Sequence, residues 1–151
     1  MTKSRLQNLF AIAIWVVVAV GFAVTAFSNG GPATYADDSQ RRLIGGIFLA
    51  FGIFGNPLMR LLTRSKPNAD QVDRDERDEQ IAAKATNTGL IAVVLFVFLG
   101  SIALWESYQG PGCVPVGWMW ILAYSTLILS HLIPGLISLG LDLGVFRHAK
   151  G

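Results

Sequence analysis

Residues 6–27, LQNLFAIAIWVVVAVGFAVTAF, contain no charged side chain and leave no polar face. A helix needs roughly 20 such residues to cross the ~30 Å hydrocarbon layer of a bilayer. The stretch therefore predicts a transmembrane helix. Lys3 and Arg5 precede it, and a basic start before an apolar run is also found in secretory signals. The apolar region of a signal is usually only about 7–15 residues long, which favours a retained span.

Three further apolar stretches follow, at about 43–62, 88–105 and 116–141. The whole chain is 52% apolar and only 15% charged, whereas soluble domains carry about 25% charged residues. We therefore predict an all-α fold, a four-helix transmembrane bundle that forms a single integral membrane domain over 1–151. Short external loops should make spans one and two, and spans three and four, antiparallel neighbours.

Orientation follows from the positive charges. Ten of the twelve Lys and Arg residues lie on one side of the predicted spans, and only Arg41 and Arg42 lie on the other. Cytoplasmic flanks are enriched in Lys and Arg, so both termini should be cytoplasmic, in a multi-pass protein of the cell membrane. Because the basic residues flank apolar segments, they give no support to nucleic-acid binding.

The longest hydrophilic segment, 64–84, is a predicted cytoplasmic loop that is too short for a domain. From Asp73 onward, opposite charges recur at i,i+4 spacing, which predicts a helical extension leading directly into the third span. Such a run is usually a solvated helix face, and a divalent-cation site is disfavoured because its acids radiate around the helix. It could also form a contact surface for a partner. The residues that we expect to carry this surface are Asp75, Glu76, Arg77, Ile81 and Lys84.

The second span is rich in small residues. Glycine lets helices approach closely in lipid, and Gly46 and Ala50 have the small-xxx-small spacing of helix-packing motifs. Packing within the protein's own bundle and a dimer face are both compatible with this pattern. The expected packing residues are Gly45, Gly46, Ala50, Gly52 and Gly55.

His131 is the one side chain with proton-relay potential deep in a predicted span, and Ser130 lies beside it. Ionisable residues inside a membrane are functional candidates by default. His131 is therefore either a hydrogen-bonding contact between helices or part of a proton, ligand or metal site. Spans one and three look like plain lipid-facing helices, so a function inside the membrane is expected between spans two and four.

No motif has the residue types and spacing of a recognisable catalytic site, and we expect no catalytic residue, metal or cofactor. Cys113 is the only cysteine, which excludes an intramolecular disulfide and a Cys-x-x-Cys centre. It lies in a predicted external turn, where it could form an intermolecular disulfide or remain a free thiol.

The segment Asp75-Glu76-Arg77 followed by Ile81, Lys84 and Ala85, directly ahead of a transmembrane helix, resembles a box in a family of small prokaryotic membrane proteins of unknown function. The resemblance implies a bacterial or archaeal membrane protein. It implies no activity, ligand or catalytic residue.

These observations favour a non-enzymatic accessory or regulatory membrane protein that contacts a partner through its cytoplasmic charged helix. The expected partners are the lipid bilayer and either a larger membrane protein or further copies of the chain. The alternative is a small oligomeric transporter or channel that uses His131 and the glycine-rich second span. Four-span multidrug exporters have a similar size, but they place a glutamate in the first helix, where this chain has none.

Overall fold

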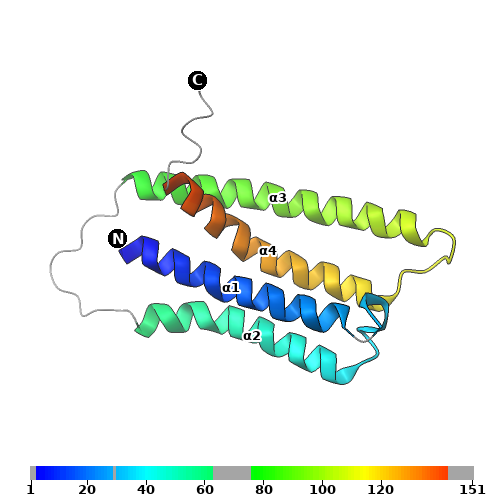
Figure 1. Ribbon diagram of the computed structural model, residues 1–151. Coiled ribbons are helices and arrows are strands. Elements are labelled where there is room, and N and C mark those ends of the chain that lie inside the picture. Colours follow the sequence, from blue (N-terminus) through cyan, green and yellow to red (C-terminus); the bar gives the residue numbers. More distant parts are fainter. Residues whose placement is uncertain (1–2, 29, 63–75, 143–151) are drawn as a thin grey trace.

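The computed structural model describes residues 3–28, 30–62 and 76–142. Over these ranges the chain is all-α, with four α-helices, one 3₁₀ helix and no strand (Figure 1). The elements are α1 (Lys3–Phe27), η1 (Pro32–Thr34), α2 (Ser39–Leu62), α3 (Glu76–Tyr108) and α4 (Val116–Asp142).

Three helices of the described part are long and apolar enough to cross a membrane, through Leu6–Phe27 in α1, Gln80–Tyr108 in α3 and Val116–Leu141 in α4. The ranges in α1 and α4 are the predicted ones. The range in α3 is longer, because α3 continues past Glu106 and begins before the predicted span. The helical extension ahead of the third span is therefore confirmed from Glu76 onward, whereas Asp73 to Asp75 lie outside the described residues.

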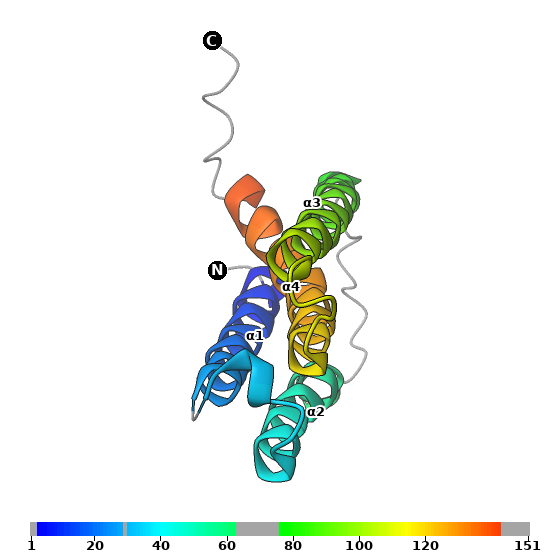
Figure 2. The ribbon, with the colours of Figure 1, turned by 90° about the vertical axis from the view of Figure 1, so that its right-hand side faces the viewer.

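The helices lie side by side in the order α2, α1, α4, α3 (Figures 1 and 2). The antiparallel pairs α1–α2 and α3–α4 are each joined at the same end of the molecule, and α1 packs against α4 to unite them. Each pair is a helical hairpin with a short connection, so its two helices are neighbours, as we predicted.

Helix α1 is the centre of the molecule, and our expectation that the first span simply faces lipid is wrong. Trp15, Val18, Phe22 and Ala26 of α1 are all buried in the main hydrophobic core. Lipid tails and helix interfaces are equally apolar, so hydropathy does not reveal which face of a span is buried. Helix α3, by contrast, packs mainly on α4 and exposes most of its large apolar side chains.

The α1–α2 hairpin is held by aromatic rings that lie against glycines. The Phe48 ring of α2 fills the space where Gly21 of α1 has no side chain, and the Trp15 ring of α1 does the same at Gly52 of α2. This exchange brings the two backbones close together, which is how helices gain contact energy in lipid.

The α3–α4 hairpin is closest at the end where α3 begins. There the Pro134 ring lies directly against Gly89, with no room for a methyl group between them. At the other end, Gly117 of α4 packs against the backbone carbonyl of Pro32 in η1, which holds α4 toward the α1–α2 hairpin. Helices α3 and α4 consequently diverge toward their connecting loop (Figure 1).

Candidate functional site

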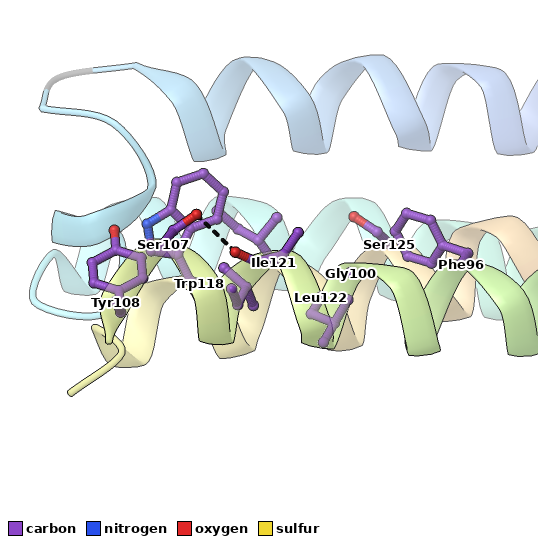
Figure 3. Close-up of a pocket in the computed structure, with 10 residues that line it drawn as sticks. Phe96, Gly100, Ser107, Tyr108, Trp118, Ile121, Leu122 and Ser125 are labelled. Carbon is purple, nitrogen blue, oxygen red and sulfur yellow. Dashed lines mark hydrogen bonds between the residues drawn. The ribbon is translucent and has the colours of Figure 1, made fainter. Parts of the chain in front are cut away.

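The diverging ends of α3 and α4 enclose a groove of about 540 Å³ (Figure 3). Ligand pockets for small molecules usually have roughly 300–1,000 Å³, and the volume of this groove falls within that range. The lining comes from these two helices alone: Phe96, Gly100, Ala103, Leu104, Ser107 and Tyr108 of α3, and Trp118, Ile121, Leu122 and Ser125 of α4.

Small side chains create this groove. Gly100 lies opposite the Leu122 side chain, and a Cβ at Gly100 would lie 3.0 Å from its Cδ1 atom. Ala103 and Ser107 continue the same small face of α3 toward the loop. These positions are three or four residues apart, the spacing at which helix side chains share one face.

The polar groups of the groove are hydroxyls and one indole. Ser107 donates a hydrogen bond of 2.7 Å to the carbonyl of Ala103, which leaves little polarity exposed there. Tyr108 and Trp118 lie at the loop end, and Ser125 lies deeper, beside Phe96 (Figure 3). Among the described residues, no carboxylate, imidazole or thiol lines the groove, so its lining offers apolar contact with amphipathic side chains at its mouth.

His131 packs across helices through its ring. The imidazole stacks on the Trp15 indole with a centroid distance of 4.3 Å and an interplanar angle of 21°. Its Nδ1 atom lies 3.0 Å from the Leu127 carbonyl and 3.1 Å from the Ser130 hydroxyl, both on α4. A carbonyl can only accept, so the first contact is a hydrogen bond in the tautomer that carries the hydrogen on Nδ1. The expected polar pair His131 and Ser130 therefore forms a local network that also contacts α1.

The glycine-rich face of α2 is covered by side chains of the first hairpin. Gly45 lies against the Tyr35 hydroxyl, Gly52 against Trp15, and Gly55 against Ile14. Trp15 contacts both Gly52 and His131, so it occupies the space between α2 and the imidazole. This packing gives no support to a path through His131 and α2.

The other two small residues expected to pack on α2 lie differently. A Cβ added at Gly46 would have no neighbouring atom within 4 Å, and Ala50 is exposed. Both therefore lie on a face of α2 that the described residues do not cover, so at these two positions packing within the protein's own bundle is not observed and the dimer face stays a prediction.

The predicted partner-contact residues are only partly described. Asp75 lies outside the described residues, and Glu76 and Arg77 are placed as the first residues of α3 without described side chains. Ile81 is half-buried and Lys84 is exposed. Cys113 is an exposed free thiol in the loop after α3.

Arg41 is a buried residue whose role the sequence did not reveal. The residue is only 5% exposed. Its guanidinium donates one hydrogen bond from Nε to the Thr25 carbonyl at 2.9 Å and another from Nη2 to the Ala26 carbonyl at 2.8 Å. It also donates to the Gly31 carbonyl and the Thr34 hydroxyl. A cation at the carbonyl end of a helix satisfies its last acceptors and its negative dipole end. The one sequence feature that could have indicated this role is a basic residue that follows a tight turn after an apolar helix.

Tyr35 completes the turn between α1 and α2. It is fully buried, edge-on to Phe22, with the Arg41 guanidinium carbon 5.6 Å from its ring centre. Its hydroxyl has no hydrogen-bond partner among the described residues. Burial raises the pKa of the Tyr35 phenol above its ordinary value of 10.0, a shift opposed by the nearby charges of Arg41 and Arg42.

A family model described as "Predicted membrane protein (DUF2178)" matches residues 2–137. No curated protein and no solved structure matches the chain. The match confirms the resemblance to a family of predicted membrane proteins of unknown function, whereas the Asp-Glu-Arg box that suggested it stays a prediction.

Proposed function

The chain belongs to the DUF2178 family of predicted membrane proteins, and from this premise we propose that it is an accessory or regulatory protein of the cell membrane. In this proposal it has no enzymatic activity, and it contacts a partner through the cytoplasmic end of α3.

The observation that carries the proposal is the continuity of α3. Its 33 residues form one helix, about 50 Å long at ~1.5 Å per residue. The hydrocarbon layer is only ~30 Å thick, so about 20 Å of the same rigid rod extends beyond it. A partner that binds the extension would therefore act directly on a membrane-spanning helix, and α3 packs mainly on one neighbour, α4.

The proposed orientation combines helix placement with charge. The starts of α1 and α3 and the ends of α2 and α4 lie at one end of the molecule, and the two hairpin turns lie at the other (Figure 1). The positive-inside rule assigns the first end to the cytoplasm, because ten of the twelve basic residues are, in the sequence, on the side of the predicted spans that contains these helix ends. Helix α2 is then the fourth crossing, supported by its 24 residues and its antiparallel packing beside α1.

The proposed contact surface consists of Asp75, Glu76, Arg77, Ile81 and Lys84. Arg77, Ile81 and Lys84 share one helix face, since they are four and three residues apart. A partner for this surface would present complementary charges around an apolar contact, an arrangement that gives specificity more than affinity.

Photocrosslinking in native membranes tests the proposal. A photoreactive amino acid at Lys84 should capture a larger membrane protein, and the triple reversal Asp75→Lys, Glu76→Lys and Arg77→Glu should abolish this capture. Glu106→Lys is the matched control, because it reverses an exposed charge near the opposite end of the same helix. Capture that survives the triple reversal would show that the docking surface is wrong. Capture of only a second copy of the chain would replace the accessory role with self-association.

Orientation needs a separate test. Reporter domains fused within 64–84 should be active in the cytoplasm, and those fused within 109–115 should be active outside. The reverse result would overturn the proposed topology without bearing on the crosslinking result.

A further inference from the structure

The groove between α3 and α4 is fixed in place by contacts at both ends of α4. Pro134 against Gly89 holds the two helices together at one end, and Gly117 against Pro32 holds the other end of α4 toward η1. Since both contacts involve glycine, neither can close further without moving a backbone. The groove is therefore a built feature of this hairpin and independent of the proposed partner contact.

The dimensions of the groove match one leaflet of a membrane. It runs along α3 from Phe96 to Tyr108, which is about 18 Å at ~1.5 Å per residue. Half of the ~30 Å hydrocarbon layer is about 15 Å. The groove thus extends from near the middle of the bilayer to the interface beside the loop 109–115.

The lining changes character along this length. Phe96, Gly100 and Leu122 present apolar surface toward the middle of the bilayer, and Tyr108 and Trp118 lie at the mouth. Tyr and Trp are the side chains that favour the membrane interface. The Ser125 hydroxyl is the one polar group at the deep end, and a serine in a helix can turn to the carbonyl four residues earlier, here that of Ile121.

We propose that this groove binds one acyl chain of a membrane phospholipid, with its headgroup held at the interface by Tyr108 and Trp118. An unfilled apolar groove forfeits dispersion contacts along its walls, and the surrounding solvent consists of acyl chains. A helix of a partner protein does not fit, because an 18 Å length of helix about 10 Å across occupies well over 1,000 Å³, and the groove holds about 540 Å³.

The test uses the full chain in vesicles that contain a phospholipid with a photoreactive diazirine near the end of one acyl chain. Crosslinked positions are mapped by mass spectrometry. Labelling should concentrate on the groove at Gly100, Leu122 and Ser125. Exposed apolar residues of α3 outside the groove, such as Leu95 and Phe98, should be labelled only at background level.

Two matched variants separate binding from general contact with lipid. Ala103→Trp fills the groove and should reduce its labelling to background, whereas Ser101→Trp places the same bulk on an exposed position of α3 outside the lining. Ser125→Phe fills the groove from α4 and should reduce labelling as Ala103→Trp does. Agreement between these two variants would show that the effect does not come from a folding defect in one of them. A phospholipid that stays bound during detergent exchange should likewise be lost in both filling variants and retained in Ser101→Trp.

Three outcomes would overturn the proposal. Even labelling over all exposed apolar positions would make the groove ordinary lipid-facing surface. Equal effects of Ala103→Trp and Ser101→Trp would mean that a large side chain anywhere on α3 reduces the labelling, whether or not it fills the groove. Crosslinks from groove residues to a second copy of the chain would assign the groove to a protein interface.

Discussion

Arg41 shows how one side chain closes the turn between two helices. Its planar guanidinium reaches two carbonyls in the last turn of α1 and one in the loop, a set of fixed directions that a lysine ammonium does not match. The sequence placed Arg41 on the external side as a charge that defines orientation. The structure adds that this charge is buried among backbone acceptors, where headgroups do not reach it.

Replacement of Arg41 by alanine should lower the free energy of unfolding by about 2–4 kcal/mol, because a charged donor is lost from several buried carbonyls. Arg42→Ala removes the same charge from the next residue, which is exposed, and should change stability by less than about 0.5 kcal/mol. Unfolding by a denaturing detergent measures both. Equal effects of the two variants would show that net charge matters and the helix cap does not.

Tyr35 should make the protein sensitive to alkaline pH. Its folded-state pKa is raised above 10.0 by burial, so the folded protein holds the phenol proton more tightly than the unfolded chain. This contribution to stability is intact below pH 10 and is lost as the pH rises from about 10 through the folded-state pKa.

The Tyr35→Phe variant should not show this loss of stability at alkaline pH. At neutral pH the variant should be as stable as the parent or slightly more so, because the buried hydroxyl has no partner to lose among the described residues. Unfolding midpoints from pH 8 to 11 test both statements. A parallel alkaline decline in the variant would assign the sensitivity to another group.

Among single helices, the sequence predicted the four α-helices of the described residues and the extent of two membrane spans. Length and hydropathy alone defined Leu6–Phe27 and Val116–Leu141, since a bilayer sets the length of an apolar run. Length and hydropathy did not indicate which face of each helix packs against its neighbours. In α2 the sequence pattern grouped Gly45 with Gly46, whereas the structure places only Gly45 against Tyr35.

Adjacent glycines of α2 should therefore respond oppositely to the same substitution. Gly45→Ala would force its methyl group against the Tyr35 hydroxyl and should cost about 1–3 kcal/mol. Gly46→Ala meets open space and should leave stability unchanged or raise it by up to about 1 kcal/mol, because alanine favours helix. Unfolding free energies in detergent provide the comparison. A loss at Gly46 as large as at Gly45 would mean that a second copy covers the outer face of α2.

At the scale of the whole molecule, short connections predicted the two hairpins but not how they meet. The contact between α1 and α4 joins residues more than 90 positions apart, for example Trp15 and His131, and no local pattern encodes it. The α3–α4 groove was missed for the same reason. Its small face, Gly100, Ala103 and Ser107, is visible in the sequence, but the depth arises only because α4 is held toward η1.

The central place of α1 can be tested with two residues of one type. Phe22 is 3% exposed between Tyr35 and Tyr124, and Phe27 of the same helix is 60% exposed. Phe22→Ala should cost about 3–5 kcal/mol by opening a cavity in the core. Phe27→Ala should cost less than about 0.5 kcal/mol. Denaturing-detergent titrations compare the two, and similar losses would contradict a core centred on α1.

The central position of α1 also affects the order of events during biosynthesis. Helix α1 leaves the ribosome before α4, and the α4 residue His131 that stacks on Trp15 follows more than 100 positions later. At roughly 5–20 residues per second, this separation lasts about 5–20 s. During that interval Arg41 and the α1 carbonyls that it caps are already synthesised, whereas the α4 residues that cover the other side of α1 are not. A membrane insertase that shields the α4-facing side of α1 would act in this interval.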